Sequence, residues 1–217
     1  MQEIQYLGET LWPKNLGHFF IILSFVAAVF SSFTFFKAVQ KQGNKAWSLL
    51  GNWGFSLHSI SVFSIIAILG YIMLNRFYEY AYVSQHVSDD LPLKYTFSAF
   101  WEGQEGSFLL WMFWHAVLGL IILNFGGKWK NAVLSILALV QAILMSMILG
   151  IQFEIGDQIY KIGSNPLLLF RDTMDIPLFR NADYVSLLGG SGLNPLLQNY
   201  WMTIHPPTTF LGFASVT

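Results

Sequence analysis

Residues 101–125 read WEGQEGSFLLWMFWHAVLGLIILNF. From Ser107 to Phe125 this stretch contains no Asp, Glu, Lys or Arg, and its length is close to the about 20 apolar residues that cross a membrane as a helix. Similar apolar runs occupy 16–36, 54–74 and 132–151, and a fifth starts at 199. We therefore predict an all-α polytopic membrane protein. Its single membrane domain, 1–217, has four complete transmembrane helices at 16–36, 54–74, 107–125 and 132–151, an incomplete fifth helix at 199–217, and two longer outer loops with short amphipathic helices.

The composition agrees with a membrane protein and excludes several other classes. The chain is 54% hydrophobic and only 11% charged, whereas soluble domains contain about 25% charged residues. A net charge of -1 argues against a nucleic-acid partner, because phosphate binding requires an excess of Lys and Arg. The absence of cysteine excludes disulfides, thiolate metal ligands and cysteine nucleophiles.

The charged residues predict the orientation in the membrane. Lys and Arg collect in cytoplasmic loops, and the connections 37–53 and 126–131 contain lysines and no acid. All 12 acidic residues lie in the other connecting segments. We expect a multi-pass protein of the cytoplasmic (inner) membrane, with the N-terminus and the loops 75–106 and 152–198 outside. The N-terminal residues lack the features of a cleaved signal peptide, so we expect the first helix to be retained.

The outer loop 152–198 is long enough to carry structure of its own. SNPLLLF at 164–170 and LNPLLQN at 193–199 each place Asn before Pro, which is typical of a helix start. Two short amphipathic helices at the membrane surface are one interpretation, and packed loop turns are the other.

His205 is the first candidate for a ligand. Pro206 and Pro207 follow it, and we expect Pro206 to exclude His205 from regular helical geometry, so that its imidazole lies at a helix break near the outer surface. Such a histidine either binds haem iron or another metal, or forms an ordinary interfacial hydrogen bond.

The other histidines have simpler interpretations. His58 and His115 lie inside predicted spans, where hydrogen bonds between helices are the main expectation and an intramembrane haem pair is the alternative. His18 and His86 are expected to be solvated.

The stretch WEGQEGSFLLW has the features of a helix start at the membrane surface. Its tryptophans can anchor at the interface, and Glu102 and Glu105 can cap the helix. Gly103 and Gly106 indicate that another helix or a flat ligand approaches this backbone closely.

Two stretches together resemble a known family. YAYVSQHVSDDLPLKYTFSAFWEGQEGSFLLW at 80–111 and LNPLLQNYWMTIHPPTTFLGF at 193–213 are similar to the N-terminal part of CcmF-type cytochrome c haem lyases, within the CcmF/CcsA haem-handling membrane family. The resemblance implies cytochrome c biogenesis, in which haem is attached to the CxxCH thiols of apocytochrome c on the outer face of the membrane. The implied cofactor is haem, of b-type before ligation.

The resemblance also implies a site. His205 matches the histidine of the family's HPP motif, which is an axial haem ligand, and the family's WGGHEGSLLLW stretch near the haem matches 101–111. The expected cofactor-binding residues are His205, Pro206, Pro207, Trp101, Glu105, Gly106, Ser107 and Trp111. Where many members have Gly and His, this chain has Glu102 and Gln104.

Whether the chain is an enzyme by itself stays open. The family's tryptophan-rich WWD segment and second axial histidine are expected after residue 217. The implied partners are apocytochrome c, other cytochrome c maturation proteins or a chain that supplies the remaining part, and membrane lipids.

Two other functions remain alternatives. The first is a polytopic transporter or quinone-reactive subunit, in which Glu102, Glu105 and His205 form an outer site. The second is a membrane scaffold whose outer histidine is incidental.

Overall fold

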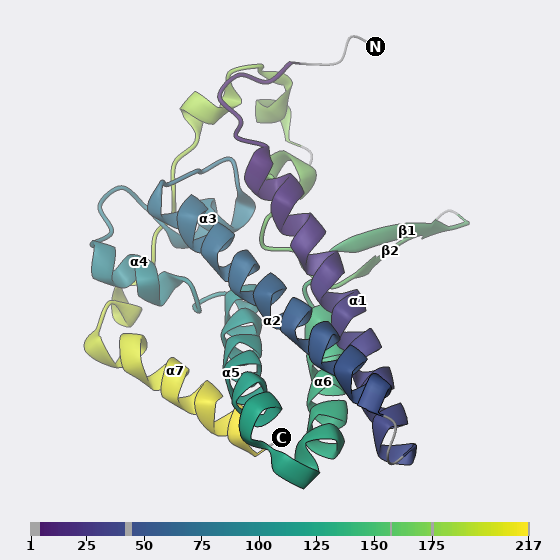
Figure 1. The fold of residues 1–217 in the computed structure, drawn as a ribbon. Coiled ribbons are helices and arrows are strands. Elements are labelled where there is room, and N and C mark those ends of the chain that lie inside the picture. The colour runs from purple at the N-terminus through teal and green to yellow at the C-terminus, as the bar shows by residue number, and fades with distance from the viewer. Residues whose placement is uncertain (1–4, 42–44, 157, 175, 217) are drawn as a thin grey trace.

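Four long helices form a closed bundle. The computed structural model describes residues 5–41, 45–156, 158–174 and 176–216. Helices α1 (Trp12–Gln40) and α5 (Gln104–Phe125) each pack against both α2 (Lys45–Leu74) and α6 (Lys130–Ser146) (Figure 1). These helices are long and apolar enough to cross a membrane, α6 together with the short 3₁₀ turn Gly127–Trp129 that precedes it. The predicted all-α polytopic class is confirmed by these four helices.

Small residues let α1 and α2 approach each other closely. The hydroxyl of Ser31 donates a hydrogen bond to the carbonyl oxygen of Gly51, at 3.1 Å. A Cβ atom on Gly51 would lie 2.6 Å from the ring of Phe35. Because lipid gives helices no hydrophobic reason to associate, such close contacts and interhelical hydrogen bonds hold membrane helices together.

The fourth membrane helix is shorter than its predicted span, 132–151. It ends at Ser146, and the backbone then turns. Met147 accepts a hydrogen bond from the amide of Ser164, at 2.9 Å, and Gly150 has a φ of 64°. This turn leads into an antiparallel hairpin of β1 (Ile151–Ile155) and β2 (Gln158–Ile162), which the sequence analysis did not predict.

A cap covers the end of the bundle at which α1 begins. We define the cap as residues 5–11, 75–103, 163–174 and 176–199. The Tyr80 hydroxyl donates a hydrogen bond to the carbonyl of Thr10, and an isolated β-bridge joins Tyr80 to Leu169. Three segments far apart in the sequence are therefore held together by one buried tyrosine.

Short helices occur in the cap, but not where the Asn-Pro motifs predicted them. The first loop contains α3 (Ala81–His86) and α4 (Leu93–Ala99). At 164–170, the Asn165 side chain accepts a hydrogen bond from the amide of Leu167, so that it closes a local turn and no α-helix follows. At 193–199, Asn194 caps only a 3₁₀ turn. The two predicted amphipathic helices are wrong, and packed turns occupy both positions. The described 3₁₀ turns of the second loop are Phe170–Asp172, Pro177–Arg180, Tyr184–Leu187 and Pro195–Leu197.

The last helix, α7 (Tyr200–Ser215), packs along α5 (Figure 1). Its first turn is capped by Asn199, whose side chain accepts a hydrogen bond from the amide of Met202 at 3.1 Å. This cap fixes where the helix begins, at the same end of the bundle as the start of α5.

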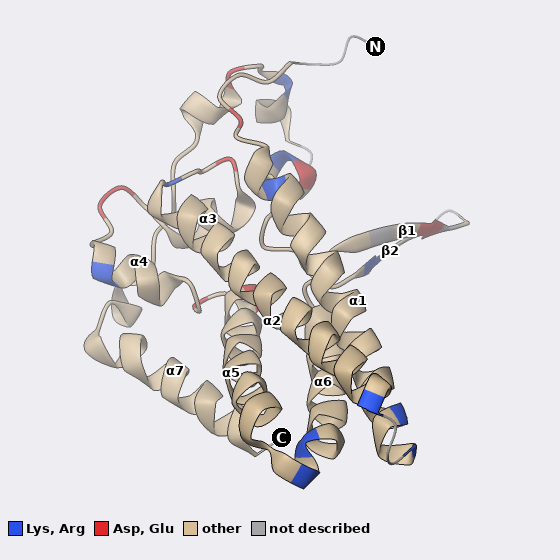
Figure 2. Cartoon of the chain, in the orientation of Figure 1, with Lys and Arg blue, Asp and Glu red and all other residues tan. Residues whose placement is uncertain are grey.

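Among the described residues, the bundle end opposite the cap carries basic but no acidic residues, whereas the cap end carries both. Figure 2 shows lysines at the α1–α2 and α5–α6 connections, whereas the acidic residues lie in and near the cap and on the hairpin. Three further acids on the outer side of the predicted topology lie outside the described residues: Glu3, Asp157 and Asp175. The N-terminus-outside orientation and the single-domain limits stay predictions.

Candidate functional site

The stretch WEGQEG forms a tight turn that leads into α5. Gly103 is the N-cap residue, and its carbonyl accepts a hydrogen bond from the amide of Ser107 at 3.0 Å. The Ser107 hydroxyl in turn donates to the carbonyl of Trp101, at 2.8 Å. Ser107 therefore holds the tryptophan against the first turn of the helix.

The two glycines of this turn make room for α3. A Cβ atom on Gly103 would lie 2.6 Å from Cε2 of Tyr82, and one on Gly106 would overlap the Tyr82 hydroxyl and the carbonyl of Phe100. The Tyr82 hydroxyl donates to that carbonyl, at 2.7 Å. Burial raises the pKa of Tyr82, so this hydroxyl keeps its proton. The close neighbour that the glycine spacing indicated is thus a short helix.

The two acids of the turn have different surroundings. Glu105 lies in the first turn of α5, where the helix dipole favours a negative charge. Gly103, the N-cap residue, has no side chain with which to cap the helix, and the position of Glu105 in the first turn agrees with the predicted role of an acid at this helix start. Burial raises the pKa of Glu102, and the nearby His86 offsets part of the shift. The Oε2 atom of Glu102 is buried without a hydrogen-bond partner among the described residues.

His205 lies inside a continuous helix, contrary to the prediction. It is in α7, and both prolines that follow it are helical as well. Pro206 has no amide hydrogen to donate to the carbonyl of Met202, four residues earlier. That carbonyl instead accepts a hydrogen bond from the indole nitrogen of Trp101, at 2.8 Å. A donor from outside the helix thus satisfies the group that proline leaves unpaired, and the helix continues.

Further contacts dock α7 onto α5 and α4. The hydroxyls of Ser98 and Thr203 are 2.9 Å apart, and the ring of Trp111 lies 6.0 Å from Phe210 and 5.6 Å from Phe213. The structure therefore brings together Trp101, Ser107, Trp111 and the HPP helix. The HPP helix follows the other three residues by roughly one hundred positions in the sequence.

The His205 side chain lies on the exposed side of α7. Exposed Ile204 and Trp201 flank it on this side, with Trp201 70% exposed. The imidazole Nε2 is 3.5 Å from the hydroxyl of Thr209, the limit of a hydrogen bond. A histidine beside large exposed apolar side chains has the features of a ligand site for an apolar group.

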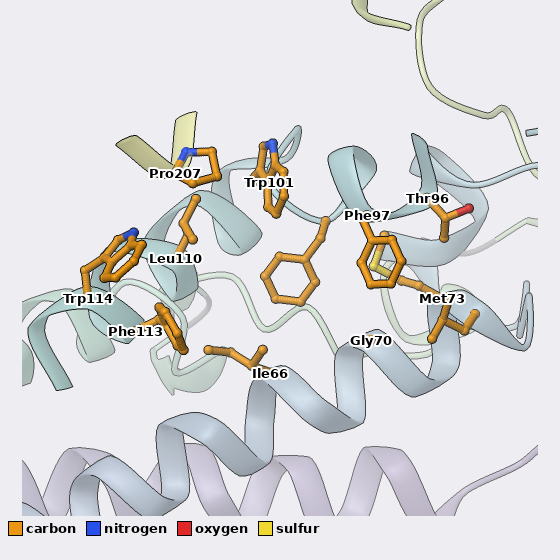
Figure 3. A pocket seen from close by; sticks show the side chains of 12 residues that line it. Ile66, Gly70, Met73, Thr96, Phe97, Trp101, Leu110, Phe113, Trp114 and Pro207 are labelled. Atoms are coloured by element: carbon orange, nitrogen blue, oxygen red, sulfur yellow. The ribbon is translucent and has the colours of Figure 1, made fainter. Parts of the chain in front are cut away.

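An apolar cavity lies on the other side of the same helix start. It has a volume of about 380 Å³, and its lining comes from α2, α4, α5 and α7. Trp101 and Pro207 both line it, with Phe113 and Trp114 beside them (Figure 3). Trp101 therefore contacts the cavity with its ring while its nitrogen holds α7.

The remaining histidines have more partners than the sequence predicted, with one exception. His18 and His86 were expected to be solvated, but each has a polar neighbour. Nδ1 of His18 lies 3.2 Å from Asn165 Nδ2. Nδ1 of His86 lies 2.7 Å from the carbonyl oxygen of Tyr82. His58 forms the predicted helix-to-helix hydrogen bond, with Ser24. Both ring nitrogens of buried His115 lack a partner among the described residues, so no such bond is seen there. An intramembrane haem pair stays a prediction.

Sequence reasoning missed Tyr82 and the carbonyl of Met202. The signal for the carbonyl was present, because a proline inside a helix always frees the carbonyl four residues before it. No local pattern marks Tyr82, whose role depends on how α3 packs.

The fold and this site define a polytopic membrane protein that holds a histidine-bearing helix along the side of a four-helix bundle. No family model matches the chain. It is 29% identical over 203 residues to the cytochrome c-type biogenesis protein CcmF of Pseudomonas aeruginosa, covering 92% of the chain and 27% of that protein. It is 26% identical over 203 residues to the biogenesis protein NrfE of Haemophilus influenzae, covering 92% and 28%.

A solved structure shares the fold. The cytochrome c haem lyase CcmF matches with a TM-score of 0.69 and 18% identity, over 100% of this chain and 30% of that one. The chain thus spans less than a third of the length of these relatives. The resemblance to CcmF-type cytochrome c biogenesis proteins is confirmed.

Proposed function

We propose that this chain is the haem-binding part of a membrane haem lyase in cytochrome c biogenesis, with His205 as an axial ligand of the haem iron. The observation that carries the proposal is the hydrogen bond between Trp101 and Met202, because it joins the two stretches that resemble the family. The names of the relatives, cytochrome c-type biogenesis proteins, support the same function.

The residues around His205 fit a haem group. Haem is a flat, largely apolar macrocycle whose iron takes imidazole ligands. His205 is exposed next to Trp201 and Ile204, which offer apolar surface on the same side of α7. Thr209 lies close enough to orient the imidazole.

The chain's contribution to the reaction is binding and orientation. Haem, when bound, would supply the vinyl groups that form thioether bonds with the thiols of a CxxCH motif in apocytochrome c. His205 would bind the iron. Trp101 would fix the position of His205 relative to α5, because its indole nitrogen donates to the carbonyl three residues before the histidine. We assign the reaction itself to the complete protein, with the cytochrome and other maturation proteins as partners.

The lysines support an orientation for this site. Five of them, Lys37, Lys41, Lys45, Lys128 and Lys130, lie at the bundle end opposite the cap, where no acidic residue is present in the described part of the chain, and Lys and Arg without acids mark the cytoplasmic side. The N-terminus, the cap and His205 would then lie outside the cytoplasmic membrane, where apocytochrome c is matured.

The described contacts favour this function over a transporter or quinone-reactive subunit. That alternative needs Glu102, Glu105 and His205 in one site. In the described part of the chain, Glu102 instead neighbours His86 and the backbone of Asn194.

The test is the absorption spectrum of the protein purified from membranes with its associated maturation proteins. His205→Ala should lose or shift the haem Soret band. The matched control is His18→Ala, which removes a histidine from the same end of the bundle but outside the proposed site, and should leave the band unchanged. A normal band in His205→Ala would refute the ligand assignment, and no haem in the wild type would refute the function.

A further inference from the structure

The hairpin β1–β2 has one apolar face. Ile151 pairs with Ile162, and Phe153 pairs with Tyr160. Because alternate residues of a strand face opposite sides, these four side chains share one face of the ribbon. They are 40%, 45%, 39% and 45% exposed, in that order. The rings of Phe153 and Tyr160 stack at 5.8 Å between centroids.

The opposite face of the hairpin carries two charged side chains. Glu154 and Lys161 lie there, one on each strand, and both are exposed (Figure 2). The described side chains of the ribbon therefore differ between its two faces, and these two carry opposite charges. Neither a strongly acidic nor a strongly basic partner is indicated by this face.

Both ends of the hairpin are attached to the end of α6. The amide of Ser164 donates to the carbonyl of Met147, which follows the last residue of that membrane-crossing helix. Gly150 and Gly163, with φ values of 64° and 73°, turn the backbone at the two ends of the ribbon. The four residues 147–150 span at most about 14 Å, so β1 starts close to the level at which α6 ends.

The hairpin runs sideways from the bundle. Figure 1 shows it extending past α1, across the direction of the helices. In a bilayer that α6 crosses, a ribbon with this starting point and direction would run along the membrane surface.

We propose that the apolar face of the hairpin rests on the lipid bilayer, at the boundary between headgroups and acyl chains on the cap side. A two-stranded hairpin is marginally stable alone in water, so contact between its exposed apolar face and lipid would stabilise it. Aromatic side chains prefer this boundary. Water among the headgroups also hydrates the outer edges of the ribbon, which the hydrocarbon core would not do.

The absence of cysteine in the chain makes a direct test possible. Nitroxide labels are attached to single cysteines in the protein reconstituted with its maturation partners in nanodiscs. Phe153→Cys and Ile162→Cys place the label on the apolar face, and Glu154→Cys and Lys161→Cys are matched controls on the opposite face of the same strands. Electron paramagnetic resonance then compares collisions with oxygen, which enters lipid, and with a nickel chelate, which stays in water.

We expect the ratio of oxygen to nickel collisions to be higher at 153 and 162 than at 154 and 161. Equal ratios, with free access of nickel at all four positions, would overturn the proposal. Exclusion of both reagents at 153 and 162 would overturn it as well, because a protein partner and not lipid would then cover the face.

Discussion

Replacing Trp101 with Phe tests whether the indole holds the helix that bears His205. The substitution keeps an aromatic ring against the apolar cavity but removes the N–H group that donates to the carbonyl of Met202. Pro206 has no N–H with which to replace it. A buried polar group without a partner costs about 1–3 kcal/mol, and both residues are half-buried, so we expect a loss of about 1 kcal/mol in the free energy of unfolding.

The assay is equilibrium unfolding in mixed detergent micelles, with two controls. Trp201→Phe makes the same chemical change at an exposed indole, and should alter the free energy of unfolding by less than about 0.5 kcal/mol. In the second control, Pro206→Ala restores an amide N–H that can reach Met202. In that background Trp101→Phe should cost less, with a coupling energy of at least about 0.5 kcal/mol.

The double-mutant cycle tests whether the Trp101 indole compensates for the N–H that Pro206 lacks. If Trp101→Phe costs the same with Pro206 and with alanine at that position, the indole does not compensate for the missing N–H. The account of why α7 stays continuous through two prolines would then be refuted.

Two further predictions concern the turn before α5. Gly106→Ala should lower the melting temperature sharply, because the added methyl group would overlap backbone atoms. Gly70→Ala is the control, because its methyl group would enter open space and should leave the melting temperature nearly unchanged. Equal effects of the two substitutions would contradict the packing. Burial raises the pKa of Glu102 above 4.5. Between the pKa of Glu102 in the unfolded chain and its higher pKa in the folded protein, the folded state binds more protons than the unfolded state. The free energy of unfolding therefore falls as pH rises through this range. Glu102→Gln should flatten this part of the curve of melting temperature against pH, and parallel curves would contradict it.

The helical part of the fold was predictable because each apolar run is long and the charges lie between the runs. A run such as 107–125 leaves no alternative to a spanning helix, since lipid cannot hydrate an exposed backbone. The hairpin was missed although IQFEI at 151–155 alternates apolar and polar residues. The predicted fourth span, 132–151, included the first residue of that strand. The apolar run continues past the end of α6, so hydrophobicity alone does not show where the helix ends.

The candidate site was only partly predictable, because its key contact crosses between distant segments. A local rule excludes the residue before proline from a helix, and it placed His205 at a break. The rule failed because Trp101, about one hundred residues earlier, supplies the hydrogen bond that the proline cannot. The family resemblance implied that both stretches lie near one haem, but only the packing of α7 on α5 showed the contact through which they meet.

The central claim is that His205 binds haem iron, and chemical rescue tests it most directly. His205→Gly should lose the haem Soret band of the purified complex, and added imidazole should restore it by taking the position of the missing side chain. His18→Gly should show neither loss nor rescue. A band that survives in His205→Gly, or one that imidazole changes equally in the wild type and both variants, would contradict the account.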